Sequence, residues 1–272
     1  NHLAIQVSEV FNGLLWWDYD QLLRTQSLGN FRQLMYAITV DPCMLEYLNG
    51  DHNVASEPDE NYARELMELY TLGEGSGYTE ADVQAAARVL TGWTFRENNG
   101  GTPILPEAVF NPANHTTANK QFSGFFNNAM VQGQTGANAG ATELNALLDM
   151  ITAKPECSLF ICRQLYRFFV HGQISAEAET ELIVPLAQVF SANAGAPDQM
   201  KTVMQAYDAL HARPNEVIVA GGMESMTNAP YLLPKMRAGA RLGHAEVKDH
   251  MFLDGLEDAY DKGRLMGTFA ED

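Results

Sequence analysis

The 272-residue sequence has few basic residues, few cysteines and no long apolar run. Seventeen Lys and Arg residues stand against 34 Asp and Glu residues, which gives a formal net charge of −17. So acidic a chain is repelled by a phosphate backbone or an anionic membrane surface, and we expect no nucleic-acid partner. No stretch reaches the roughly 18 apolar residues that indicate a membrane-spanning helix. We therefore expect no membrane span.

The chain has three cysteines, Cys43, Cys157 and Cys162. A small and odd number of cysteines does not indicate a disulfide framework. Cys157 and Cys162 are five positions apart, which places them on roughly opposite sides of one predicted helix. That arrangement suits neither a clamp nor a metal pair, and we expect packed, unreactive thiols because free Cys is usually buried. The sequence also contains no Gly-rich phosphate loop and no CxxC, HExxH or GxSxG motif.

Residues 1–95 have a helical pattern of apolar residues. The stretch 58–73 begins with Pro58 and acidic residues and ends at Gly73, which are typical helix boundaries. The next helix is predicted to begin at Thr79 as the N-cap, with Asp82 completing a variant of the capping box. Helices resume after residue 141 and continue to about residue 190.

Between these helical parts, residues 96–140 are dominated by Gly, Asn, Pro and Thr. We expect a long loop-rich insertion, and such loops are usually functional or mobile. A second break is the small-residue stretch SANAGAPDQ at 191–199, which we take as the boundary between domains. After it the sequence predicts one helix, the strand Val217–Ala220 and then mostly irregular chain.

Acid/base or metal-binding chemistry in the helical part would fall on five candidates: His2, Glu65, Glu68, His115 and Lys120. No metal is assigned, because the sequence does not show that these residues meet. For Glu65 and Glu68 the alternative is a solvated helix face on which Arg64 forms ion pairs with acidic neighbours. For His115, which lies in the loop-rich insertion, the alternative is exposure at the surface.

Four stretches carry a resemblance to a known family: GNFRQLMYAITVDPCMLEYLNG, PDENYARELMELYTLGEGSGYTEADVQAAARVLTGWTF, FNPANHTTANKQFSG and ALLDMITAKPECSLFICRQLYRFFV. Through them, residues 1–189 resemble the bacterial domain-of-unknown-function family 1800. The resemblance implies a mostly α-helical domain, here 1–190, of an exported kind, and it supplies no activity. Asn1 and His2 resemble the end of the family's Trp-His-Asn-His motif, so we expect part of the family domain to be missing before them. The family's His-Asp pair with a following Lys is matched by His115 and Lys120, but Thr116 stands where the Asp is expected.

The last 73 residues, from MKTVMQAYDALHARPNEVIVAGGMESMTNAPYLLP onward, resemble part of thiolase, the acetyl-CoA acetyltransferase family. The resemblance implies an α/β fragment of one helix, one strand and part of a loop domain over 200–272. Thiolase chemistry needs a nucleophilic Cys, a base and an oxyanion hole. The resemblance places Ala196 at the position of that Cys, and the family's later His and Cys motifs would follow Asp272. We therefore expect no thiolase activity.

Binding of CoA to this fragment remains a weaker alternative. The resemblance places Met266 and Gly267 in a stretch that lines the CoA-side pocket. A binding site needs a largely pre-formed concave shape, however, and most of its walls are not in this segment. We favour a strand and loop without their sheet, and we expect no thiolase-like oligomer.

Together these patterns predict a mostly α-helical domain joined to a C-terminal α/β fragment, as a chimera or an artificial join. Three hypotheses for function remain. The helical domain is an exported binding or scaffold domain of otherwise unknown partners, or an uncharacterised metal-dependent or hydrolytic enzyme. Alternatively, the chain is an acetyl-CoA acetyltransferase, a function suggested by the name of the family that residues 200–272 resemble. The first hypothesis implies export, whereas a thiolase would be cytoplasmic or organellar.

Overall fold

The computed structural model divides the chain into two units, Asn1–Asn215 and Glu216–Asp272, which are described separately here. The residues that it describes are 2–6, 8–10, 12–99, 102–211, 231–232, 247–249, 252 and 257. The predicted strand Val217–Ala220 and the proposed pocket residues Met266 and Gly267 lie outside the described residues.

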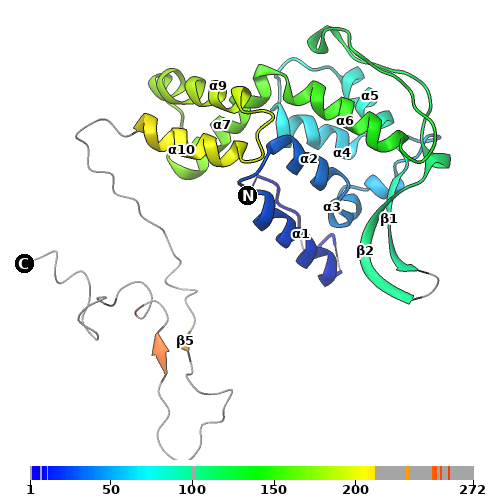
Figure 1. Ribbon diagram of the computed structural model, residues 1–272, viewed down its shortest axis with the longest axis horizontal. Helices are drawn as coiled ribbons and strands as arrows, with labels where there is room; N and C mark the ends of the chain where they lie inside the picture. Colours follow the sequence, from blue (N-terminus) through cyan, green and yellow to red (C-terminus); the bar gives the residue numbers. More distant parts are fainter. Residues whose placement is uncertain are drawn as a thin grey trace, which may run out of the picture. The chain divides into compact units, whose positions relative to one another are not determined.

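The first unit is mostly α-helical, which confirms the predicted fold class (Figure 1). Helices α7, α9 and α10 lie together at one end of the unit, and a two-stranded hairpin, β1–β2, lies at the other. The α-helices are α1 (Gly13–Gln26), α2 (Phe31–Thr39), α3 (Pro42–Tyr47), α4 (Asn61–Glu65), α5 (Glu80–Val89), α6 (Ala139–Thr152), α7 (Pro155–Phe169), α8 (Ala176–Ala178), α9 (Val184–Ala192) and α10 (Gln199–His211).

Helix α6 is at the centre of this unit. It contacts α2, α5, α7 and the π-helical turn Leu66–Thr71 (η2) that continues α4. Its apolar face is fully buried through Leu144, Leu147, Leu148 and Ile151. Burial of such a side chain contributes about 1.5–3 kcal/mol, so this face is a main source of stability for the whole helical unit.

The predicted end of the helix at Gly73 is confirmed. The backbone N–H of Gly73 donates to the carbonyl oxygen of Met67 at 3.0 Å, and the residue has a φ of 88°. A Cβ atom at this position would lie 2.7 Å from the ring of Phe160 on α7. Gly73 is therefore required both by its left-handed backbone and by the close approach of α7.

The predicted loop-rich insertion contains a β-hairpin that the sequence analysis missed. Strand β1 (Trp93–Asn99) pairs antiparallel with β2 (Thr102–Phe110), and Trp93 is opposite Phe110. A second small pair joins β3 (Lys120–Gln121) to β4 (Met130–Val131). The prolines and glycines of this region hid the strand pattern, because such residues usually interrupt strands.

At the start of α5, the side chain of Asp82 accepts from the backbone of the N-cap residue Thr79, as the predicted capping box requires. Asp82 accepts hydrogen bonds from the backbone N–H of Thr79 at 2.7 Å and from its hydroxyl at 2.9 Å. The same carboxylate also accepts from the backbone N–H and the hydroxyl of Ser123, both at 2.7 Å. Asp82 is fully buried. Because it also binds Ser123, this capping residue holds the insertion against α5.

The described part of the second unit is small. Strand β5 (Tyr231–Leu232) pairs antiparallel with β6 (Lys248–Asp249), and Tyr231 is opposite Asp249. Across all described residues of the chain, none of the helices is both long and apolar enough to cross a membrane.

Replacement of Asp82 tests the connection between α5 and the insertion. We expect Asp82→Ala to lower the free energy of unfolding by about 3 kcal/mol, because four donors lose a charged acceptor inside the protein. Denaturant unfolding followed by circular dichroism measures this loss. The exposed Gln84→Ala on the same helix is the control and should change stability by less than about 0.5 kcal/mol. Equal effects of the two variants would contradict this role of Asp82.

Candidate functional site

A buried cluster of ionisable side chains joins the insertion to the central helix α6. The carboxylate of Glu143 on α6 lies between His115 and Lys120, both from the insertion. Its Oε1 is 3.0 Å from His115 Nε2, and its Oε2 accepts from Lys120 Nζ at 2.5 Å. Thus two of the five candidates meet, and they meet on a carboxylate that the sequence analysis did not single out.

The cluster is closed to solvent. The side chains of His115, Lys120 and Glu143 are 1%, 0% and 0% exposed. The alternative of a surface-exposed His115 is therefore wrong. Its ring packs edge-on against Phe110 at the end of β2, with 5.1 Å between ring centroids. Burial here is possible because each charged group has polar partners inside the protein.

Backbone and hydroxyl groups complete these contacts. Nδ1 of His115 lies 2.8 Å from the carbonyl oxygen of Thr91 and 3.1 Å from its hydroxyl. Lys120 Nζ donates to the carbonyl oxygen of Thr116 at 2.6 Å, and Glu143 Oε1 accepts from the backbone N–H of Gln134 at 2.7 Å. The cluster thus gathers the end of α5, the residues around β3 and β4, and α6.

The charges of the cluster are set by burial and by pairing. Burial opposes ionisation of Glu143, but the hydrogen bonds from His115, Lys120 and Gln134 outweigh it and lower the pKa of the carboxyl group. Burial lowers the pKa of Lys120, and the pairing with Glu143 offsets only part of that effect. Glu143 is accordingly the fixed negative charge around which the cluster is organised.

The other three candidates lie elsewhere in the unit. His2 Nε2 is 3.0 Å from the carbonyl oxygen of Tyr70, and burial lowers the pKa of His2. Glu65 ends α4 and Glu68 lies in η2. Burial, with a contribution from the charge of Glu68, raises the pKa of Glu65. None of the hydrogen bonds among the described residues joins these three to the His115–Lys120–Glu143 cluster.

Of the two ion pairs predicted for Arg64, with Glu60 and with Glu68, the ion pairs of the described residues include the one with Glu60. Arg64 pairs with Glu60 at 3.1 Å, one helical turn before it, and also with Glu80 at the start of α5. Within the described residues, no three His, Cys, Asp or Glu side chains gather as metal ligands would.

Glu143 carries a signal that the sequence analysis overlooked. It is four residues before Leu147 and eight before Ile151, so it lies on the apolar face of α6. A charged residue on an otherwise apolar helix face indicates a buried partner of opposite charge. That partner could not be identified from the sequence, because Lys120 is 23 residues away and comes from an irregular segment.

The prediction of packed thiols is confirmed. All three cysteines are free and buried. Burial, with the nearby charge of Asp41, raises the pKa of Cys43 to about 12, and burial raises that of Cys162 to about 12. A buried thiol with a raised pKa is a poor nucleophile, and the three cysteines are packing residues of the core.

The fold places this part of the chain in the class of mostly α-helical domains. Comparison with known proteins gives its family. The family described as "Protein of unknown function (DUF1800)" matches residues 1–219, which include every α-helix described above. The chain belongs to the DUF1800 family. A second family, described as "Thiolase, N-terminal domain", matches residues 173–272 and overlaps the first match over α8–α10.

Several curated relatives are acetyl-CoA acetyltransferases that match over part of their length. The enzyme of Saccharomyces cerevisiae is 47% identical over 72 residues, which are 26% of this chain and 18% of that protein. The enzyme of Schizosaccharomyces pombe is 57% identical over 56 residues, or 21% of this chain and 14% of the relative. The enzyme of Cupriavidus necator is 34% identical over 134 residues, which are 48% of this chain and 34% of that protein.

The chain therefore spans less than a fifth of the length of two of these relatives, and 34% of the third. No solved structure matches it. The overlap of the two family matches, residues 173–219, contains the predicted boundary at 191–199, which stays a prediction.

Removal of one partner from the buried cluster should be strongly destabilising. We expect Lys120→Met to lower the free energy of unfolding by about 3–5 kcal/mol, because it leaves the Glu143 carboxylate buried without its cation. The double variant Lys120→Met/Glu143→Gln should lose less, since no unpaired charge remains. The exposed pair Arg24–Asp20 provides the control, and Arg24→Met should cost less than about 1 kcal/mol. A double variant as unstable as the sum of its two single variants would contradict this account.

The lowered pKa values also predict acid sensitivity. The pKa values of Glu143 and Asp82 are lower in the folded chain than their ordinary values of 4.5 and 3.8. Below those values the unfolded chain binds more protons, so stability falls as pH falls. On urea unfolding, the contribution of these two carboxyl groups should appear as a decline in the free energy of unfolding below about pH 4.5. Glu143→Gln should reduce this decline, whereas the exposed Glu177→Gln should retain it.

Proposed function

We propose that the helical domain is a non-catalytic binding or scaffold domain, fused in one chain to a thiolase-like segment that lacks thiolase activity. One observation carries the first part of this proposal. The residues most suited to acid/base chemistry, His115, Lys120 and Glu143, are directed at one another and at backbone groups rather than at an open cleft.

A general acid or base must come within hydrogen-bond distance of its substrate. Both oxygens of Glu143 are occupied, Oε1 by His115 and Gln134 and Oε2 by Lys120. A substrate would have to displace a contact inside a fully buried cluster. The arrangement suits a clamp that fixes the insertion on α6 better than it suits a reacting site.

For the thiolase-like segment, the proposal rests on Ala196. This residue stands where the resemblance places the nucleophilic Cys, and a methyl side chain offers no covalent route. Its backbone is also engaged, because its N–H donates to the carbonyl oxygen of Asn193 at 2.9 Å and its own carbonyl accepts from Asn30 at 2.9 Å. The three cysteines of the chain are buried in the helical unit and are poor replacements.

The competing function is acetyl-CoA acetyltransferase activity, and the relatives of that name favour it. Their identity to this chain reaches 57%, but over 56 residues. A likeness over so short a segment is consistent with shared ancestry of that segment without the reaction of the whole enzyme.

A thiolysis assay tests the proposal. With acetoacetyl-CoA and CoA as substrates, we expect no release of acetyl-CoA above the rate without protein, because no cysteine is placed to attack the thioester. Ala196→Cys should be equally inactive, since a base and an oxyanion hole are also needed. An authentic thiolase at the same concentration is the positive control. Turnover by the unaltered chain would overturn the proposal.

A further inference from the structure

Helix α10 is fastened to the rest of the helical unit by the side chain of its first residue, Gln199. Its Oε1 accepts from the backbone N–H of Phe31 at 3.1 Å, at the start of α2, and its Nε2 donates to the carbonyl oxygen of Phe190 on α9 at 2.8 Å. Gln199 is only 2% exposed. One buried amide therefore connects the start of α2, the last turn of α9 and the start of α10.

The turn before α2 holds the same region from the other side. Asn30 caps α2 by accepting from the N–H of Gln33, and its Nδ2 donates to the carbonyl oxygens of Ala194 and Ala196 at 2.7 and 2.9 Å. The first N–H groups of a helix have no partner within that helix. In α10, those of Met200 and Lys201 donate to the carbonyl oxygens of Gly29 and Leu28 at 3.0 and 3.1 Å.

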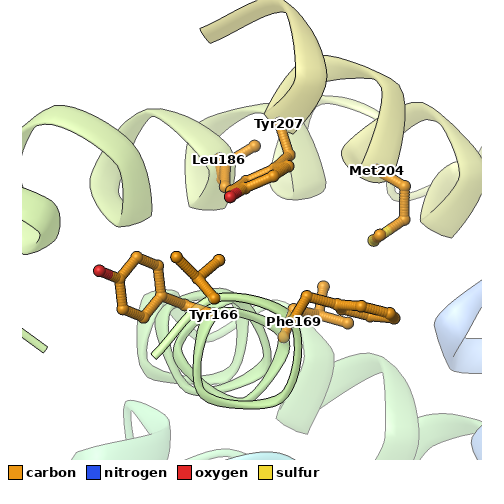
Figure 2. A pocket seen from close by; sticks show the side chains of 7 residues that line it. Tyr166, Phe169, Leu186, Met204 and Tyr207 are labelled. Carbon is orange, nitrogen blue, oxygen red and sulfur yellow. The ribbon is translucent and has the colours of Figure 1, made fainter. Parts of the chain in front are cut away.

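Beyond its first turn, α10 is held by apolar contacts along one face. Met200 and Val203 are buried, whereas Lys201, Gln205 and Asp208 are exposed on the other side, so the helix is amphipathic. Figure 2 shows Met204 and Tyr207 of α10 facing Tyr166 and Phe169 of α7. A void of about 20 Å³ remains between them. The fit is tight at Gln199 and looser toward the end of α7, where Phe169 is still 59% exposed.

Helix α10 belongs to both family matches. The thiolase match begins at residue 173, and α10 lies in residues 173–219, where the two family matches overlap. Helix α10 packs on α9 within the helical unit, in agreement with the DUF1800 match, which also covers it. A helix of thiolase-like sequence thus fills a place in the helical domain through a specific set of hydrogen bonds at its first residue.

We propose that the surface formed by α7, α9 and the turn at residues 28–30 is a receptor for one amphipathic helix, which α10 occupies within the same chain. The bonds of Gln199 fix the position of that helix, and Val203 anchors its apolar face. This inference rests on the proposed function of the domain as a binding domain, and it names the partner: a single helix with a buried Gln at its start and apolar residues spaced three to four apart.

Hydrogen exchange of the full chain tests the role of Gln199. We expect Gln199→Met to accelerate amide exchange in α10 by about ten- to hundredfold, because the N–H of Phe31 and the carbonyl of Phe190 lose their partner. Helix α6 should keep its protection. Gln205→Ala, an exposed change on the same helix, is the control and should leave α10 protected. Unchanged exchange in Gln199→Met would overturn the proposal.

Binding in trans tests the receptor directly. Val203→Asp puts a charge into the buried face and should release α10 from the full-length chain. A fluorescein-labelled peptide of residues 198–211, DQMKTVMQAYDALH, should then bind this variant by fluorescence anisotropy and should bind the unaltered chain at least tenfold more weakly. A peptide with Val203→Asp should bind neither. No binding to a variant that retains its α6 protection would overturn the proposal, and the exchange experiment decides if the variant does not fold.

The result of the thiolysis assay is independent of these experiments. If the peptide fails to bind while thiolysis is absent, the receptor inference alone is wrong. If acetoacetyl-CoA is cleaved, the proposed function is wrong whether or not the peptide binds.

Discussion

The carboxylate of Glu143 is the constraint on which the helical unit depends. It lies on the central helix, yet its partners His115 and Lys120 come from the least regular part of the unit. A buried charge of this kind is stable only while its partners stay in place. The insertion is therefore held on α6 by this cluster, in addition to its buried apolar residues Phe122, Phe126 and Val131. Asp82 acts in the same way on α5, where it binds the insertion through Ser123.

The helices could be predicted from the sequence because their signals are local. The N-cap at Thr79, the end at Gly73 and the buried thiols all follow from residue types at short spacing. The buried cluster could be predicted only in part. His115 and Lys120 were selected by family resemblance, while Glu143 looked like one more acidic residue of an acidic chain. Its partners are fixed by tertiary packing over 23 and 28 residues of sequence, which no local pattern encodes.

The hairpin β1–β2 and the role of α10 were missed for a related reason. In β2, Pro103 and Pro106 interrupt the alternation by which strands are usually recognised. The stretch 191–199 reads as a flexible joint because it consists of small residues. In the folded unit, two carbonyl oxygens of this stretch accept hydrogen bonds from Asn30, and its last residue is buried. Composition alone does not distinguish a linker from a turn that a distant side chain holds.

The turn around Ala194 also bears on where such chains can be cut or joined. Exposed small-residue turns are the usual choice for inserting a tag, a cleavage site or a new domain. At this turn, lengthening the chain by even one residue would pull the carbonyls away from Asn30 and move Gln199 out of its place between α2 and α9. A viable break point in this region is decided by which backbone groups already have partners, and solvent exposure is a poor guide to it.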